Sequence, residues 1–246
     1  MTAHAIEIHD VTRLFGAAKA VDGLSLSVPE GAVFGLLGPN GAGKTSTIRM
    51  LMGHLRPSSG AVQTLGQDPW QHTEATRRRI AYVSENMELP GWMTPDAAMR
   101  FCRRLYPTWD QALAETLRDG FQLKRSQRFS ELSKGQKRSL CILLALGQNA
   151  DLLVLDEPAA GLDVLARRDF LDRILDVACA GGRTVVLSSH ILSDLERVVD
   201  RVAILSHGTL KLEGELEDLK QKFGLNLEDM FVEVAGTNHN KGLQKE

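Results

Sequence analysis

Residues 33 to 55 read VFGLLGPNGAGKTSTIRMLMGHL, and this stretch decides the fold class. The apolar run from Val33 to Leu37 predicts a short buried strand. A glycine-rich loop follows at residues 38–45 and then gives way to a helix. The helix is predicted because its apolar residues recur at spacings that share one face, namely Ile48, Leu51, Met52 and Leu55.

The loop GPNGAGKT matches the pattern G-x-x-x-x-G-K-T in the strand–loop–helix context that this pattern requires. Glycines let several backbone N–H groups point at one phosphate, and the helix N-terminus adds partial positive charge. We expect Lys44 to reach the β- and γ-phosphates of a nucleotide and the Thr45 hydroxyl to bind Mg²⁺. A glycine-rich turn without a ligand is the alternative, and the full pattern in its context argues against it. The expected nucleotide-binding positions of this segment are Gly38, Pro39, Asn40, Gly41, Ala42, Gly43, Lys44, Thr45 and Ser46.

A second apolar run, LLVL at residues 152–155, is followed directly by Asp156 and Glu157. Ligands of open α/β sheets collect at the carboxyl ends of the strands. Asp156 is expected to hold Mg²⁺ through water, and Glu157 is expected to polarise the water that attacks the γ-phosphate. An ordinary solvated strand end has the same appearance, but beside the glycine-rich loop that alternative is the weaker one.

A third stretch, LSKGQ at residues 132–136, opens a helix whose apolar face carries Leu140, Leu143 and Leu144. Locally, Ser133 and Gln136 have the spacing of a capping box. The same serine hydroxyl, a glycine N–H and the helix N-terminus would also make an anion site. Both interpretations stay open on these residues alone.

The amino-acid composition argues against several classes of protein and of binding site. The 246 residues include 43% hydrophobic residues and carry a formal net charge of −2, which is typical of a globular protein and gives no reason to expect nucleic acid as a partner. The three cysteines lie far apart without a C-x-x-C pair, so we expect buried thiols and neither a disulfide framework nor a zinc site. We find no signal peptide and no apolar run of the roughly 18 residues that span a bilayer.

The pattern along the chain predicts an α/β body with a helical insertion. Strands and turns alternate before residue 84 and again from residue 151, with Asp22-Gly23 as one turn and a hairpin across His207-Gly208. Residues 94–147 show helical periodicity, with one helix starting at Thr94 or Pro95, another over residues 109–117 and a third starting at Ser133. We therefore divide a single domain, residues 1–235, into a body (1–84 and 151–235) and a helical subdomain (about 85–150), followed by a polar tail at 236–246.

GPNGAGKT, LSKGQ, LVLDEP, GLD and SSH occur in the order seen in the nucleotide-binding subunits of ABC transporters, which this chain resembles from about Ile6 to Val234. The resemblance implies a P-loop ATPase body with an N-terminal antiparallel β part and an inserted helical subdomain. It is closest in pattern to the exporter branch that handles antibiotics, sodium or polymers, on the features YPTWD at 106–110 and LEDMFVEV near the end.

The resemblance also implies roles for single residues. Phe15 would stack on adenine, although an aromatic at a strand end is often core. His190 would contact the γ-phosphate and Asp163 would couple two sites, with Ala160 where a serine is common. Glu85 stands where the family usually has a glutamine that touches Mg²⁺ and the γ-phosphate. A carboxylate there can ligate Mg²⁺ more strongly but adds negative charge beside ATP.

We therefore expect ATP and Mg²⁺ as ligands and ATP hydrolysis as the reaction. In the family, two such subunits dimerise head to tail, so Ser133, Gly135 and Gln136 would complete the site of a partner ATPase, identical or related. A separate transmembrane permease subunit would hold the chain at the cytoplasmic face of the membrane. Residues 87–93 either belong to the core or line the groove for that permease. The alternative is a soluble ABC ATPase acting on nucleic acid or the ribosome, which lacks support because no heptads and no second motif set occur.

Overall fold

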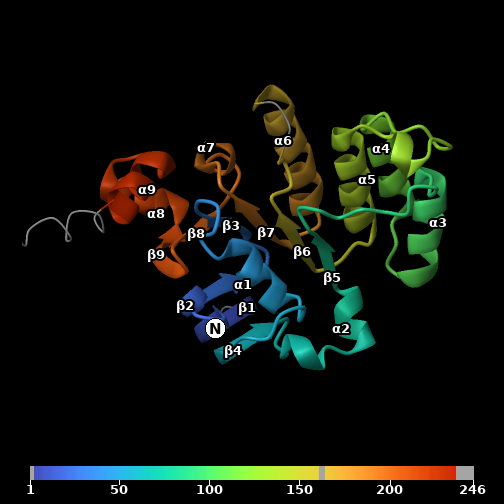
Figure 1. Cartoon of the computed structure of the whole chain (residues 1–246). Helices are drawn as coiled ribbons and strands as arrows, with labels where there is room; N and C mark the ends of the chain where they lie inside the picture. Colours follow the sequence, from blue (N-terminus) through green and yellow to red (C-terminus); the bar gives the residue numbers. More distant parts are fainter. Residues whose placement is uncertain (1–2, 161–163, 237–246) are drawn as a thin grey trace, which may run out of the picture. The chain divides into compact units, whose positions relative to one another are not determined.

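The computed structural model describes residues 3–160 and 164–236 (Figure 1). The chain forms two compact units. Unit 1 contains residues 1–71 and 186–246, and unit 2 contains residues 72–185. The chain thus leaves unit 1 after its first third and returns to it within a strand.

Unit 1 begins with an antiparallel sheet of three strands in the order β2-β1-β4. These strands are β1 (His4–Phe15), β2 (Ala18–Pro29) and β4 (Ser59–Thr64). In β1 the buried Ile6 and Ile8 lie opposite Val28 and Leu26 of β2, so apolar pairs cover one face. The antiparallel β part implied by the sequence is confirmed.

The turn expected at Asp22-Gly23 is wrong, because both residues lie inside β2. The register between β1 and β2 shifts around this point, which marks a β-bulge. Gly23 has φ 63°, and its N–H donates to the Thr12 hydroxyl at 3.1 Å instead of continuing a regular ladder. A glycine in a strand interior can mark a bulge as well as a turn, and the long partner strand decides between them.

A second group of strands in unit 1 carries the glycine-rich loop. Strand β3 (Val33–Leu37) is buried along its whole length and runs parallel to β8 (Arg201–Ser206), which pairs antiparallel with β9 (Thr209–Glu215). His207 and Gly208 both have positive φ, as the tight turn of this hairpin requires, and the expected hairpin is confirmed. The Asp200 carboxylate accepts the Val33 N–H at 2.8 Å and so fixes the start of β3.

The helices of unit 1 are short. They are α1 (Lys44–Leu51), η1 (Pro69–Gln71), α7 (Leu192–Leu195), α8 (Leu216–Phe223) and α9 (Leu227–Gly236). Helix α7 is a single turn of four residues, and α9 has ten residues.

Two parallel strands in unit 2 end side by side. Strand β5 (Ile80–Val83) pairs with β6 (Leu152–Asp156), with Val83 opposite Leu155. Strand β6 is buried throughout, as its continuous apolar sequence predicts. Strand β7 (Thr184–Ser189) contains the boundary between the two units.

Several helices of unit 2 start at residues whose side chains cap them. The helices of this unit are α2 (Glu74–Arg78), α3 (Pro95–Leu105), α4 (Gln111–Gly120), η2 (Phe129–Glu131), α5 (Lys134–Gly147) and α6 (Val164–Ala180) (Figure 1). The side chains of Thr94, Asp110 and Ser133 cap α3, α4 and α5. The helix predicted over residues 109–117 therefore starts two residues late, because Asp110 is its cap.

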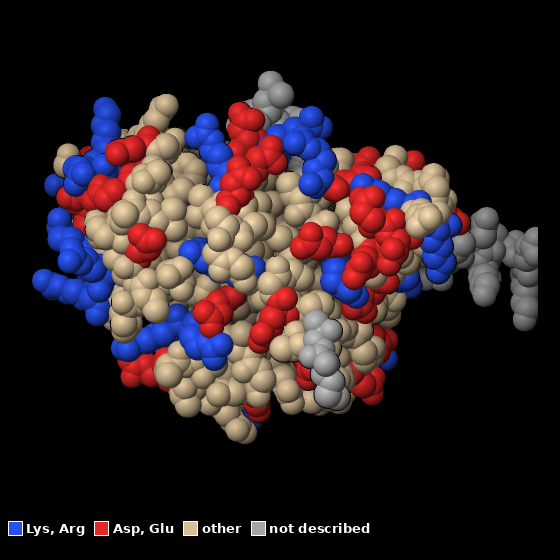
Figure 2. Space-filling model, turned by 180° about the vertical axis from the view of Figure 1, so that it is seen from behind, with Lys and Arg blue, Asp and Glu red and all other residues tan. Residues whose placement is uncertain are grey.

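The three cysteine thiols differ in their exposure. Cys141 is buried and Cys102 is half-buried, but Cys179 is exposed, so the expectation of buried thiols is wrong for Cys179. Acidic and basic side chains both occur over the face seen in Figure 2, often as neighbours. Within residues 3–160 and 164–236, we find no helix long and apolar enough to cross a membrane.

Gly147 at the end of α5 should not accept a side chain. A Cβ at this position would lie 2.7 Å from the Trp109 ring, whereas a Cβ at Gly120, at the end of α4, would meet open space. We expect Gly147→Ala to lower the free energy of unfolding by about 1–3 kcal/mol through overpacking. The matched control Gly120→Ala should leave it unchanged or raise it by up to about 1 kcal/mol. Urea unfolding of both variants measures this, and equal midpoints would contradict the packing described here.

Candidate nucleotide-binding site

The loop after β3 packs so tightly that two of its positions require glycine. Gly38 has φ 147°, and a Cβ there would lie 2.2 Å from the Leu205 carbonyl oxygen of β8. Gly43 has φ 105°, and a Cβ there would lie 2.5 Å from the Ala20 carbonyl oxygen of β2. Both contacts are with backbone, which cannot move aside as a flexible side chain could. The loop is therefore clamped between two strands of unit 1.

Lys44 lies inside this loop. Its side chain is only 5% exposed, and its Nζ donates to the carbonyl oxygens of Gly38 at 2.7 Å and Pro39 at 3.3 Å. The ammonium group is thus held where the loop backbone curves around it. Thr45 and Ser46 follow in the first turn of α1 and are half-buried. A positive charge, a helix N-terminus and loop N–H groups in one place can bind phosphate.

A backbone hydrogen bond places His190 beside the loop. The Gly38 N–H donates to the carbonyl oxygen of Ser189, the last residue of β7, at 3.3 Å. His190 follows at once and is exposed. The Ser189 hydroxyl accepts the Ile191 N–H at 3.0 Å, which fixes the chain on the other side of His190. The histidine and the lysine loop therefore belong to one constellation in unit 1.

Phe15 ends β1 and is 48% exposed, which excludes the core alternative for this ring. The guanidinium carbon of Arg13 lies 4.6 Å from the ring centroid, so a cation covers one face of the ring. A half-exposed aromatic with a cation on one face can take a planar ligand on the other.

The two acids after β6 are both buried in unit 2. Asp156 is 1% exposed and Glu157 is 8% exposed. Glu157 has φ 49°, a left-handed conformation that is uncommon for residues other than glycine. Such backbone strain recurs at functional sites, where the surrounding structure holds it in place.

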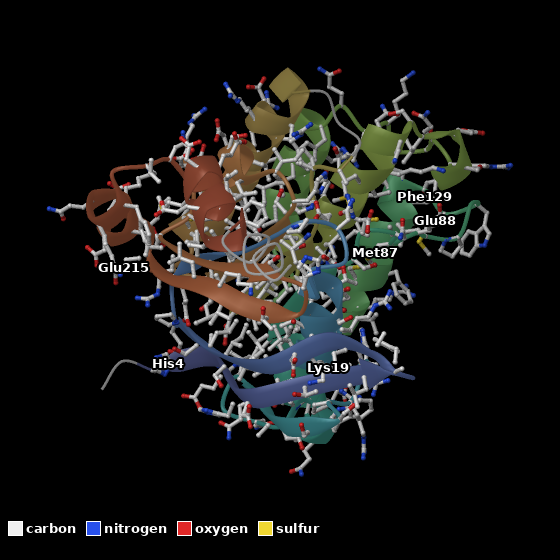
Figure 3. The ribbon with its side chains drawn as sticks, turned by 60° about the vertical axis from the view of Figure 1, so that its left-hand side comes forward. His4, Lys19, Met87, Glu88, Phe129 and Glu215 are labelled. Atoms are coloured by element: carbon white, nitrogen blue, oxygen red, sulfur yellow. The ribbon has the colours of Figure 1, made fainter. Side chains whose placement is uncertain are left out.

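Glu85 and Asn86 follow β5 and are exposed. They are among the residues that line a cavity of ≈ 200 Å³ within unit 2. Figure 3 labels two of the residues of this region, Met87 and Glu88, together with Phe129. The cavity is lined by Glu85, Asn86, Met87, Glu88, Lys134, Gly135, Lys137, Arg138 and Ala160.

The LSKGQ stretch forms the capping box that its spacing predicts. The Ser133 hydroxyl accepts the Gln136 N–H at 3.2 Å, and the Gln136 side chain accepts the Ser133 N–H at 3.1 Å. Ser133 is exposed, whereas Gly135 and Gln136 are half-buried. The box engages the backbone N–H groups of Ser133 and Gln136 but not that of Gly135, so it leaves the anion interpretation open.

The predicted residues fall into two groups. Unit 1 holds the loop residues, His190 and Phe15, and unit 2 holds Glu85, Asp156, Glu157 and the capping-box residues. Asp163 lies outside the described residues. Sequence reasoning missed Arg138, which lies on α5 one turn after the capping box. The sequence did not single it out, because Lys134 and Lys137 are also cations in the first part of the same helix.

Comparisons with known proteins identify the family of this chain. The family model described as ABC transporter matches residues 21–160. The chain is 36% identical over 228 residues to a daunorubicin/doxorubicin resistance ATP-binding protein of Streptomyces peucetius, covering 91% of this chain and 69% of that protein. It is 34% identical to a bacitracin transport ATP-binding protein of Bacillus licheniformis, covering 88% of this chain and 72% of that protein.

A solved structure described as the ATP binding subunit of an ABC transporter is similar over nearly the whole chain. The TM-score is 0.82 at 29% sequence identity, covering 94% of this chain and 99% of the other. This match extends the family assignment beyond the segment that the family model covers. The chain therefore belongs to the ABC transporter family and has the fold of its ATP-binding subunits.

Proposed function

We propose that this chain binds ATP and hydrolyses it to ADP and phosphate, as the ATP-driven subunit of a transporter. The observation that carries the proposal is the clamped loop of unit 1, with the Lys44 ammonium held by the Gly38 carbonyl at 2.7 Å. Loop N–H groups and Lys44 would stabilise charge on the phosphates, and His190 beside the loop would position the γ-phosphate. Phe15 would stack on adenine with its uncovered face.

The donor atoms fit Mg²⁺. A hydroxyl from Thr45 and carboxylates from Asp156 and Glu85 are hard oxygen ligands, which Mg²⁺ prefers. Among residues 3–160 and 164–236 we find no group of three His, Cys, Asp or Glu side chains that could hold a metal ion. In proteins, Mg²⁺ is usually held by one or two carboxylates together with water and substrate phosphates. When bound, it would neutralise charge on the phosphates.

Glu157 is the best candidate for the residue that polarises the attacking water. The residue is 8% exposed and so is largely shielded from bulk solvent, and its backbone is in a strained conformation. A general base must be positioned before its basicity matters. The strained backbone therefore supports Glu157 as the general base, and the neighbouring Asp156 would hold the metal.

We further propose a head-to-tail dimer with an identical or related ATPase. Ser133, Gly135 and Gln136 would then contact the nucleotide of the partner, and Asp163 would couple the two sites. The capping box supports this because it orders the helix N-terminus without occupying the backbone N–H of Gly135. Nucleotide would become part of the interface, so dimerisation would depend on ATP and end with hydrolysis.

A transmembrane permease is the proposed second partner. Large apolar side chains are exposed on unit 2, and Trp92 is 68% exposed, which does not suit the core alternative for residues 87–93. The others exposed there are Met87, Phe101 and Leu105. An exposed apolar patch built from such side chains would be a protein interaction site. The named relatives act in antibiotic resistance and transport, which favours export from the cytoplasmic face of the membrane over a soluble role on nucleic acid or the ribosome.

Glu157→Gln tests the ATPase proposal. The variant should bind ATP with unchanged affinity and form the ATP-dependent dimer, because charge recognition by the loop is intact. Its kcat should fall by about 10²- to 10⁴-fold, since the general base is lost. Phosphate release and size-exclusion chromatography with ATP measure both. Glu228→Gln, at an exposed position of α9, is the control, and a wild-type rate in Glu157→Gln would contradict the assigned base.

Glu85→Gln tests the unusual carboxylate. Replacing it with the residue usual in the family removes a negative charge, so the Mg²⁺ concentration for half-maximal hydrolysis should rise by about three- to ten-fold. Glu88→Gln is the matched control, because Glu88 is an exposed acid that lines the same cavity. A titration of ATPase activity with Mg²⁺ measures the shift. The same response in both variants would contradict a specific metal role for Glu85.

A further inference from the structure

Arg138 joins two segments of unit 2 that are distant in sequence. Its Nη1 donates to the Ser84 carbonyl oxygen at 2.7 Å, and its Nη2 donates to the Glu157 carbonyl oxygen at 2.8 Å. Ser84 precedes Glu85, the residue proposed to contact Mg²⁺. Glu157 is the proposed general base. One guanidinium group therefore holds the backbone next to one functional acid and the backbone of the other.

Both carbonyl groups belong to turns that end parallel strands. The Ser84 carbonyl also accepts the Met87 N–H at 3.2 Å, and the Glu157 carbonyl also accepts the Ala160 N–H at 3.1 Å. The strands before these turns, β5 and β6, pair in register up to Val83 and Leu155. The paired residues of β5 and β6 end there, so the strand hydrogen bonds do not connect the two turns. Arg138 connects them, because its two NH₂ groups donate to one carbonyl of each turn.

The environment of Arg138 is suited to a fixed bridge. The side chain is half-buried and lines the same cavity as Glu85. Burial lowers the pKa of its guanidinium, and the neighbouring Cys141 and three carboxylates oppose that change. These carboxylates belong to Glu85, Asp156 and Glu157. A planar guanidinium keeps its charge under such conditions and presents donors in a rigid fork, which an ammonium group cannot do.

Arg138 also supports the strained backbone of Glu157. The φ of 49° at Glu157 is energetically unfavourable for a residue other than glycine, and it persists only if contacts around it hold the residue. The hydrogen bond from Arg138 to the Glu157 carbonyl is one such contact. Since a small displacement of a catalytic group lowers the rate strongly, the position of this carbonyl bears on hydrolysis.

We infer that Arg138 is a positioning residue for hydrolysis. From helix α5, which Ser133 caps, it holds the turn of Glu85 and the turn of Glu157 in a fixed position relative to each other. The inference rests on the proposed ATPase function. It assigns Arg138 no contact with ATP, so its loss should affect kcat and spare nucleotide binding. It also links the capping-box helix to the proposed base, since the bridge and the capping box lie on consecutive turns of α5.

The test compares Arg138→Lys and Arg138→Gln with wild type. Both replacements keep a hydrogen-bond donor, so both should fold. We expect kcat to fall by about 10- to 100-fold in each, with the dissociation constant for ATP within about three-fold of wild type. Lysine should not restore the rate, because one ammonium group cannot reproduce the two-armed bridge. A residue that only supported the fold would not separate kcat from binding in this way.

Arg183→Lys is the matched control. Arg183 is another half-buried arginine of unit 2, whose guanidinium donates to the Asn149 side chain at 2.6 Å and to the Leu146 carbonyl at 3.5 Å. Its kcat should stay within two-fold of wild type. The inference is overturned if either Arg138 variant keeps half of the wild-type kcat, or if the loss appears only in ATP affinity. If wild type itself releases no phosphate, the proposed function falls and this inference falls with it.

Discussion

The contact on which unit 1 depends is the approach of the loop after β3 to the carboxyl end of β8. At Gly38 the space beside the backbone is already taken by the Leu205 carbonyl, 2.2 Å from where a Cβ would lie. Only glycine can occupy position 38 in this packing. The packing allows the Gly38 N–H to donate to the Ser189 carbonyl, and this hydrogen bond fixes the position of His190. The Lys44 ammonium is then held by the carbonyls of the same loop. One steric constraint on the backbone therefore orders the lysine, the histidine and the start of α1 together.

In unit 2 the proposed functional side chains are acids at the ends of strands. A buried parallel pair of strands, β5 and β6, brings the turns of Glu85 and Glu157 to the same edge. Burying carboxylates is costly unless cations or donors compensate them. The guanidinium of Arg138 lies between the two turns and offers both charge and hydrogen bonds. The helix that carries it is nearly all apolar beyond this point, so its packing in the core fixes where the guanidinium lies.

Local patterns predicted more of this molecule than long-range ones did. The glycine-rich loop, the strand before Asp156 and the capping box at Ser133 are each set by neighbouring residues, so the sequence was enough to find them. The mixed fold with an antiparallel N-terminal part followed from the family resemblance that these motifs carry. The bulge at Gly23 was not, because whether a glycine turns or bulges a strand depends on the partner strand. The role of Arg138 was not predicted for the same reason, because its two hydrogen-bond partners are 54 and 19 residues away in sequence.

The most direct test of the central claim, an ATPase that drives a membrane protein, is a pull-down with a tagged copy of this chain. The bait would be incubated with detergent-solubilised native membranes, and the bound proteins would be identified and quantified. The account predicts a stoichiometric polytopic membrane protein that is lost when the exposed Trp92 is changed to Ala. Recovery of ribosomes, nucleic acid or no partner would contradict the transport role and leave only the ATPase chemistry.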